Sequence, residues 1–195
     1  MVGQALERHV EWGGPVWVQQ VQQGMDWLGD VRGLRILEVG ARYGGTSTLF
    51  GLLGAEVVGI DTDAEALDVA RRRATAAGVA DRVTFQQRSG HPDDLPTQFD
   101  VAFTKSVMVV VPDLAAMLAG LASALVDGGR LLLVENARGP GVVHAARIIR
   151  RRSLRPHGAS YFTRASLDVV RQRFDVQLEN WTAFPPTVVV GAVRR

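Results

Sequence analysis

A glycine-rich segment and an aspartate that follows it are the residues whose types and spacing best suit ligand binding. Gly40 and Gly44 come directly after the short apolar run 34–39, and Asp61 ends a second apolar run, 21 residues after Gly40. A glycine bend between a buried strand and a helix brings backbone N–H groups to the carboxyl edge of a parallel sheet. A carboxylate at the tip of the neighbouring strand can accept hydrogen bonds from both hydroxyls of a ribose. The sequence therefore predicts a site for a ligand that contains a nucleoside.

The glycine pattern separates two kinds of nucleoside ligand. A dinucleotide-binding segment has the pattern G-x-G-x-x-G, in which the second glycine allows the backbone to approach the pyrophosphate. Here Arg42 occupies the position of that second glycine. S-adenosylmethionine has no pyrophosphate, so its binding does not require the close approach. The pattern therefore favours S-adenosylmethionine over NAD.

Polar residues also follow two later apolar runs. Thr104 and Lys105 come after the run 99–103, and Glu135 comes after the run 130–134. Polar side chains at the carboxyl ends of buried strands face the crevice in which open α/β sheets bind ligands. These residues are therefore candidates for the site, although Lys105 can equally serve to pair with a neighbouring acid.

The elements that must position these residues follow from apolar periodicity and from helix start and stop signals. The predicted strands are 34–39, 57–60, 82–87, 99–103, 130–134, 176–181 and 188–193. The predicted helices are 15–28, one that starts at 46–48, 64–77, 114–125, 142–152 and 163–174. Thr46, Ser47 and Thr48 are candidates for the cap of the second helix, and Thr62 with Glu65 has the spacing of a capping box for the third. Strands that alternate with helices predict an α/β fold.

Three stretches resemble the motifs of class I S-adenosylmethionine-dependent methyltransferases. ILEVGARYGGTSTLF (36–50) and AEVVGIDTDAEALDVARRRA (55–74) are similar to the first two motifs of that family. FDVAFTKSVMVVVPDLAAMLAGLASALVDGGRLLLVEN (99–136) is similar to the later half of the same domain. The resemblance implies a doubly wound, Rossmann-like fold, with a mostly parallel seven-stranded sheet and an antiparallel C-terminal strand.

The same resemblance implies S-adenosylmethionine as the cofactor and indicates which residues contact it. They are Glu38, Gly40, Ala41, Arg42, Gly44, Asp61, Thr62, Gly90, His91, Thr104 and Lys105. The E-x-G-x-x-x-G-x-S variant of the catechol-type O-methyltransferases matches Glu38, Gly40 and Gly44, and it matches Thr46–Ser47 less closely.

The chain also differs from the family pattern at two of these positions. Many members have glycine in place of Arg42, and an acid that contacts the adenine amine often follows the glycine at Gly90, where this chain has His91. A third difference concerns metal binding. The catechol-type enzymes place an aspartate after the fourth strand, where this chain has the residues 103–105, Phe-Thr-Lys. We therefore predict no metal site and activity that needs no divalent metal.

Two segments outside the matched motifs complete the predicted single domain of residues 1–195. In the family, an N-terminal helix such as the one within 1–29 forms a lid over the cofactor. Four residues there either line the site or simply pack in the core: Trp12, Trp17, Gln19 and Gln20. The segment 139–160 is extra relative to a minimal domain, and such insertions usually cap the acceptor site. Acceptor identity is expected to depend on that segment.

The candidates for a catalytic base are His91, His144 and Glu135. Methyl transfer from a sulfonium is an in-line displacement, so the protein mainly positions donor and acceptor and excludes water. A hydroxyl acceptor of high pKa needs a base as well, whereas an acidic acceptor or a neutral amine does not. Each of the three candidates also fits a purely structural role, and for His91 this is a surface loop.

A cluster of arginines lies within the predicted cap. Five arginines occur between positions 147 and 155, and Arg147 and Arg151 share a helical face at i, i+4 spacing. Guanidinium groups bind carboxylate or phosphate through paired hydrogen bonds, which would suit an anionic acceptor. The alternative interpretation is a solvated cationic surface.

These observations favour a methyltransferase that acts on a small molecule by O- or N-methylation. An RNA methyltransferase that uses the arginines of 147–155 is an alternative, but the D/N-P-P-Y/F signature and an appended RNA-binding module are absent from the sequence. A binding partner of nucleic-acid type is therefore not expected. A second alternative is a cofactor-binding protein with lost or altered chemistry, which the differences at Arg42 and His91 leave open.

Composition bounds the class of protein. The chain has 195 residues, of which 47% are hydrophobic, and its formal charge is +2, as expected for one globular domain. Of its 22 basic residues all but Lys105 are arginine, and it contains no cysteine, so disulfides are excluded. Purely apolar stretches such as 107–111 are far too short to cross a bilayer. A soluble cytoplasmic enzyme is expected, and its oligomeric state is left open.

Overall fold

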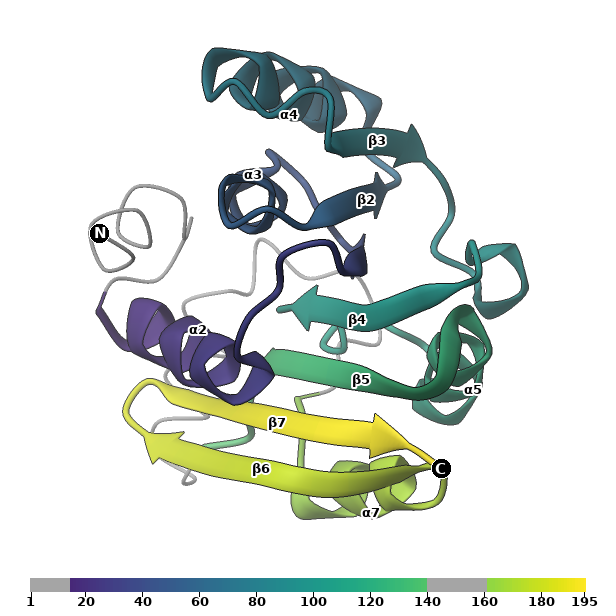
Figure 1. Cartoon of the computed structure of the whole chain (residues 1–195). Coiled ribbons are helices and arrows are strands. Elements are labelled where there is room, and N and C mark those ends of the chain that lie inside the picture. The colour runs from purple at the N-terminus through teal and green to yellow at the C-terminus, as the bar shows by residue number, and fades with distance from the viewer. Residues whose placement is uncertain (1–14, 140–160) are drawn as a thin grey trace.

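The computed structural model describes residues 15–139 and 161–195, and seven strands in these ranges form one sheet. The strands are β1 (Arg35–Val39), β2 (Glu56–Asp61), β3 (Val83–Gln87), β4 (Phe99–Lys105), β5 (Leu125–Asn136), β6 (Phe174–Ala183) and β7 (Pro186–Arg194). They lie in the order β3-β2-β1-β4-β5-β7-β6 (Figure 1). All neighbouring pairs are parallel except those of β7, which runs antiparallel to both β5 and β6. The predicted fold class is confirmed.

Helices cover both faces of this sheet (Figure 1). They are α2 (Pro15–Leu28), α3 (Gly45–Leu52), α4 (Ala64–Ala76), the short 3₁₀ helix η1 (Pro92–Asp94), α5 (Leu114–Ala124) and α7 (Arg164–Arg171). Residues of α2, α3 and α4 share one buried apolar cluster, and residues of α5 and α7 share a second. The described part of the chain is therefore a three-layer sandwich with the sheet in the middle.

The central strands are buried on both faces because their apolar residues are consecutive rather than alternating. In β1, Ile36 belongs to the cluster under α2–α4, and Leu37 belongs to the cluster under α5 and α7. In β4, Phe103 contacts Phe50 of α3 edge to face, with ring centroids 5.5 Å apart. Each fully buried side chain of this size stabilises the fold by about 1.5–3 kcal/mol, because burial removes its apolar surface from water.

Helix α2 runs antiparallel to β5, which brings its first turn to the carboxyl edge of the sheet. At its start, the ring of Trp17 lies 5.8 Å from Nζ of Lys105, the last residue of β4. At its end, Arg130 near the amino end of β5 donates to the carbonyl oxygen of Leu28 at 2.6 Å. Gly24 allows this close packing, because a Cβ there would lie 2.7 Å from Leu132. The predicted helix 15–28 is confirmed.

Two predicted helix starts are wrong. Helix α3 begins at Gly45 with Gly44 as its N-cap, and the hydroxyl residues 46–48 lie buried inside the helix. Gly44 has a φ of +71°, and a Cβ on it would lie 2.7 Å from atoms of the α4 and β3 side chains, so the turn requires glycine there. Helix α4 is capped by Asp63, whose side chain accepts from the N–H of Ala66 at 3.0 Å, and not by Thr62.

Other boundaries agree with the sequence or shift by a few residues. Thr163 caps α7 through a capping box with Ser166, as its position predicted. Strand β4 extends to Lys105, and β5 begins at Leu125, directly after α5 ends. The pairing of β4 with β5 shifts its register between Phe99 and Val101, which accommodates the longer β5.

Part of the predicted lid and nearly all of the predicted cap lie outside the described residues. These undescribed ranges are 1–14 and 140–160, and the second contains His144 and the five arginines of 147–155. Within the described ranges, no helix is long and apolar enough to cross a membrane.

Candidate functional site

The candidate site lies at the carboxyl edge of the sheet, between β1 and β4. The chain adds β2 and β3 on one side of β1 and places β4 on the other side, so the strand order reverses at this point. Connections that leave a sheet in opposite directions open a crevice outside the carboxyl ends of the strands. The ends of β1, β2 and β4 bring Gly40, Asp61 and Lys105 to that edge, as predicted.

The turn after β1 is tightly fixed. The N–H groups of Gly40 and Ala41 both donate to the carbonyl oxygen of Ile60 at the end of β2, at 2.9 and 3.0 Å. Gly40 has a φ of +79°, and a Cβ on it would lie 2.3 Å from Cγ2 of Val107 in the segment after β4. Glycine is therefore required at position 40 by both conformation and space.

Asp61 ties this turn to the start of α4. One of its carboxylate oxygens accepts from the N–H of Arg42 at 2.9 Å, and the other accepts from the N–H of Asp63 at 3.0 Å. Each carboxylate oxygen can accept a second hydrogen bond, so Asp61 keeps acceptor capacity for a diol. The predicted position of Asp61 beside the glycine turn is confirmed by this geometry.

Arg42 contributes to the turn through its backbone. It adopts a φ of +47°, in the left-handed region that favours glycine, although it carries a side chain. Its guanidinium carbon lies 5.0 Å from the centroid of the Tyr43 ring. An arginine can thus replace the usual glycine, because the group that meets Asp61 is the N–H.

Glu38 is buried near the end of β1 and faces α3. Its side chain accepts a hydrogen bond from the hydroxyl of Ser47, which therefore links α3 to the sheet instead of capping the helix. Burial raises the pKa of Glu38 to about 7, and the Ser47 hydrogen bond and the charge of Lys105 oppose this rise. With a pKa of about 7, the carboxyl group of Glu38 can gain or lose a proton, or pair with a cation, near neutral pH.

Lys105 projects from the same face of the sheet as Glu38. The register pairs Glu38 with Phe103, two residues before Lys105, and side chains two apart in a strand share a face. Burial lowers the pKa of Lys105, while the carboxylates of Glu38 and Glu135 act to raise it. The site therefore combines opposite charges with the ring of Trp17 on α2.

Glu135 lies on the other face, next to the segment that follows β4. We call residues 106–111 the post-β4 loop. One carboxylate oxygen of Glu135 accepts from the hydroxyl of Thr104 at 2.7 Å and from the N–H of Val107 at 3.3 Å. The other accepts from the N–H of Met108 at 3.1 Å. Burial raises the pKa of Glu135 to about 7, and these three hydrogen bonds oppose the rise.

His91 and Gly90 occupy the loop between β3 and η1. The His91 side chain is 64% exposed, and its Nδ1 accepts from the N–H of Asp93 at 3.4 Å at the start of η1. Gly90 has a φ of +68°, and a Cβ on it would lie 3.8 Å from Val39 at the end of β1. Gly90 therefore borders the site, while His91 lies on the surface. The roles predicted for both residues stay predictions.

Two further predicted contacts are located at the same edge. Ala41 is a buried residue of the glycine turn, and its side chain would clash with a Cβ on Gly59. The carbonyl oxygen of Thr62 accepts from the Gln87 side chain at 3.2 Å, which joins β2 to β3. Their contact with a cofactor remains a prediction.

Buried polar groups near α2 and α3 provide a signal that the motifs did not. Gln20 is 1% exposed, and within the described ranges neither its amide nitrogen nor its amide oxygen has a hydrogen-bond partner. The buried hydroxyl of Thr48 likewise has no partner among the described residues. Unpaired polar atoms in a core cost about 1–3 kcal/mol each, so such groups often bind a ligand or water. In the sequence, Gln20 is a polar interruption of the apolar stripe of α2.

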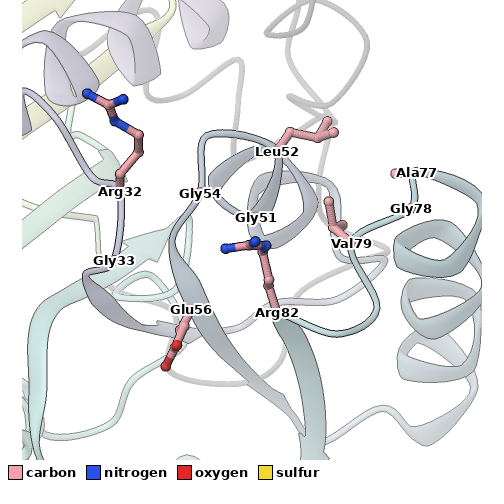
Figure 2. A pocket seen from close by; sticks show the side chains of 10 residues that line it. All are labelled: Arg32, Gly33, Gly51, Leu52, Gly54, Glu56, Ala77, Gly78, Val79 and Arg82. Carbon is pink, nitrogen blue, oxygen red and sulfur yellow. The ribbon is translucent and has the colours of Figure 1, made fainter.

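A surface hollow of about 510 Å³ lies at the opposite, amino-terminal edge of the sheet (Figure 2). It is lined by Arg32, Gly33, Gly51, Leu52, Gly54, Glu56, Ala77, Gly78, Val79 and Arg82. Its two arginines already have acidic neighbours. Arg32 bonds to Asp30 at 2.6 Å, and Arg82 lies 3.8 Å from Asp81. The nucleoside-binding features lie at the other edge, so we place the candidate site there.

Among the described residues, no group of three or more histidine, aspartate and glutamate side chains is placed to hold a metal ion. The absence of a metal requirement stays a prediction of the sequence.

Part of the chain matches a known family of domains. Residues 37–131 match the family model described as a methyltransferase domain. The ubiquinone biosynthesis O-methyltransferase of Aeromonas salmonicida is 34% identical over 122 residues, which are 60% of this chain and 50% of the relative. The chain thus spans about half the length of the curated relatives that it matches.

Solved structures share the architecture across nearly the whole chain. An S-adenosylmethionine-dependent methyltransferase from Mesorhizobium loti superposes with a TM-score of 0.74 at 20% identity, covering 93% of this chain and 99% of that one. Magnesium protoporphyrin IX methyltransferase from Synechocystis PCC 6803, solved with bound S-adenosylhomocysteine, superposes with a TM-score of 0.73 at 21% identity, covering 98% and 94%. At these identities the likeness shows the fold.

Proposed function

We propose that this chain is a class I S-adenosylmethionine-dependent methyltransferase, which transfers a methyl group from S-adenosylmethionine to a small molecule. The observation that carries the proposal is the hydrogen bonding of Asp61. Its carboxylate is bonded to the glycine turn, and each of its two oxygens can accept one further hydrogen bond. The name of the curated relatives favours O-methylation, and N-methylation is the runner-up.

The residues present fit S-adenosylmethionine. Because Gly40 has no Cβ, the turn can pack directly against Val107. Asp61 can accept hydrogen bonds from the ribose hydroxyls, and Gly90 borders the end of β1. The unpaired amide of Gln20 provides a donor and an acceptor on α2, the element expected to cover the cofactor. We infer that these groups, together with Glu38 and Lys105, hold the nucleoside and the polar end of the cofactor.

The chemistry of the transfer requires little of the protein beyond positioning. S-adenosylmethionine supplies an electrophilic methyl group on a sulfonium, which a nucleophile of the acceptor displaces in line. The protein holds the donor against the carboxyl edge of the sheet, and α2 with Trp17 shields that edge from water. An acidic hydroxyl or a neutral amine would react in such a site without a strong base.

The three predicted bases differ in how they could act. Glu135 is completely buried with both oxygens bonded, which leaves it badly placed to take a proton from an acceptor. His91 lies on the surface loop at η1. His144 lies outside the described residues. We therefore favour an acceptor whose nucleophile is already deprotonated or is a neutral amine.

The finer identity of the acceptor is also a proposal. We infer an anionic small molecule from the five arginines between 147 and 155, which lie outside the described residues. A cytoplasmic location likewise stays a prediction of the composition.

Isothermal titration calorimetry with S-adenosylhomocysteine tests the cofactor assignment. We expect the wild type to bind it, and we expect Asp61→Ala to weaken binding roughly tenfold to a hundredfold, because a charge-assisted hydrogen bond contributes about 1.5–3 kcal/mol. Asp100→Ala is the matched control, since Asp100 accepts from the N–H of Arg35 at the opposite end of β1.

Two results would contradict the proposal at different levels. Unchanged affinity in a folded Asp61→Ala variant would refute the role of Asp61. Binding of NAD in place of S-adenosylhomocysteine would refute the whole assignment. A screen of phenols, carboxylates and amines with a methyl-labelled donor would then identify the acceptor.

A further inference from the structure

The first half of the post-β4 loop is fixed to β5 by hydrogen bonds. The N–H of Ser106 donates to the carbonyl oxygen of Val134 at 2.9 Å, and the Ser106 hydroxyl accepts from the Asn136 side chain at 2.9 Å. The N–H groups of Val107 and Met108 donate to the carboxylate of Glu135. Consecutive residues of the loop are thus held by consecutive residues of one strand.

The conformation of this loop needs such support. Ser106 has a φ of +61°, in the left-handed region that residues other than glycine rarely adopt. A backbone in that region persists where the surrounding structure holds it. Ser106 directly follows β4: Asn136 donates to its hydroxyl, and Glu135 accepts from the N–H of the next residue, Val107. Met108, two residues after Ser106, is buried in the cluster under α5.

The carboxylate of Glu135 is well matched to this task. A carboxylate has only acceptor sites, and here it receives a hydroxyl and two backbone N–H groups. An amide at this position would turn one oxygen into a donor, which would face a donor of the loop or the hydroxyl of Thr104. The arrangement therefore distinguishes glutamate from glutamine, although the two have the same shape.

The loop that Glu135 holds touches the cofactor turn. Val107 lies so close to Gly40 that a Cβ on this glycine would approach Cγ2 of Val107 to 2.3 Å. On its other side, Gly40 donates to the carbonyl oxygen of Ile60 at 2.9 Å. The turn is thus confined between β2 and the loop, and a contiguous set of contacts joins Glu135 through Val107 to Gly40.

We propose that Glu135 is a positioning residue for the cofactor turn: by holding the N–H groups of Val107 and Met108, it keeps Val107 packed against Gly40. This inference rests on the proposed function, because it assigns Gly40 to the binding of S-adenosylmethionine. It gives Glu135 a role in cofactor affinity instead of proton transfer. The acid acts on the cofactor through another residue and never touches it.

The experiment compares S-adenosylhomocysteine binding by calorimetry in three single variants of the full chain. Glu135→Gln is expected to weaken binding about five- to thirtyfold, since it disturbs one or two buried hydrogen bonds of the loop. Val107→Ala is expected to weaken binding in the same direction. Asp100→Asn is the matched control, because it makes the same chemical change in a carboxylate that accepts a backbone N–H at the opposite edge. Its affinity should stay within about twofold of wild type.

The double variant Glu135→Gln with Val107→Ala tests whether Glu135 affects cofactor binding through Val107, which we call the route. If Glu135 acts through Val107, the two losses of affinity do not add, because the second substitution removes a contact that the first has already disturbed. Losses that add fully would overturn this route. A thermal shift in every variant separates a lower stability from a lower affinity.

The possible failures are distinguishable. If Glu135→Gln unfolds earlier yet binds S-adenosylhomocysteine as wild type does, Glu135 only stabilises the fold and the inference is overturned. If Glu135→Gln does not fold, unchanged affinity in Val107→Ala overturns the inference on its own. If the wild type does not bind S-adenosylhomocysteine, the proposed function fails and this inference fails with it.

Discussion

Two buried glutamates, Glu38 and Glu135, occupy similar places near the ends of β1 and β5 but lie on opposite faces of the sheet. Burial raises the pKa of each to about 7. Glu38 faces α3 and accepts from the hydroxyl of one residue, Ser47, whose backbone N–H also acts to lower the pKa of Glu38. Glu135 faces the cluster under α5 and accepts from a hydroxyl and two backbone N–H groups.

This difference shows that a position at a strand end does not decide the role of an acid. Glu38 retains acceptor capacity, and it lies beside Lys105 on the face that α2 and α3 cover. Its capacity is available to a ligand with a positive group. The capacity of Glu135 is largely used by the post-β4 loop, so its effect on a ligand is indirect.

The largest expected difference between the two acids is in stability. Glu135→Ala leaves the Thr104 hydroxyl and two backbone N–H groups buried without their acceptor, and we expect it to lower the free energy of unfolding by about 3–5 kcal/mol. Glu38→Ala leaves the Ser47 hydroxyl unpaired and removes a desolvated acid, so about 1–2 kcal/mol is expected. Urea denaturation at pH 7 measures both. Equal losses in the two variants would contradict the contrast.

The motifs could predict the place of these residues but not their partners. Asp61 and the glycine turn were predictable because the strand ends meet at one edge, which follows from apolar runs alone. The role of Glu135 was not predictable in this way, because two of its partners are backbone N–H groups of residues about 30 positions earlier in the chain. Any residue type except proline can supply an N–H, so such a contact leaves almost no mark in the sequence. Arg42 illustrates the same point, because its N–H replaces what a glycine would provide.

The helix caps show where local sequence is sufficient. Thr163 caps α7 at the start of the predicted helix 163–174, and the structure adds a capping box with Ser166. Ser47 has the right type for a cap, but the N-cap is Gly44, three residues earlier, and Ser47 donates to Glu38 instead. Local propensity thus identified the helix, and the tertiary contact decided its first residue.

A second difference is expected in the pH dependence of stability. The pKa of each acid is raised to about 7 in the folded protein, above the ordinary value of 4.5. The folded state therefore binds the proton more tightly than the unfolded state does. The stabilisation that each protonated acid contributes to folding is complete below about pH 4.5, and it is lost as the pH rises to about 7. The charge of Lys105 lowers the pKa of both carboxyls and moderates this loss.

Glutamine variants separate the two acids in this pH range. Glu38→Gln cannot ionise, so its stability relative to wild type should increase from pH 5 to pH 8 by about 1–3 kcal/mol. Glu135→Gln should gain a similar amount over this range but start from a lower stability, because its amide disturbs the hydrogen bonds of the loop at every pH. Urea denaturation at several pH values measures the slopes. Parallel curves for wild type and Glu38→Gln would show that Glu38 does not titrate in this range.

The smallest expected effect concerns single hydroxyl donors, and it measures how much each acid depends on one partner. Ser47→Ala and Thr104→Val each remove a hydroxyl that lowers the pKa of its acid. Glu38 keeps one backbone interaction, with residue 47, whereas Glu135 keeps two N–H groups, so the pKa of Glu38 should rise further than that of Glu135. Stability should change by only about 1 kcal/mol in either variant, partly offset in Ser47→Ala because alanine favours a helix. Carboxyl ¹³C shifts followed by NMR from pH 5 to pH 9 give the pKa of each acid directly. An equal rise for the two acids would mean that the two backbone N–H groups at Glu135 stabilise its carboxylate no better than the one at residue 47 stabilises Glu38.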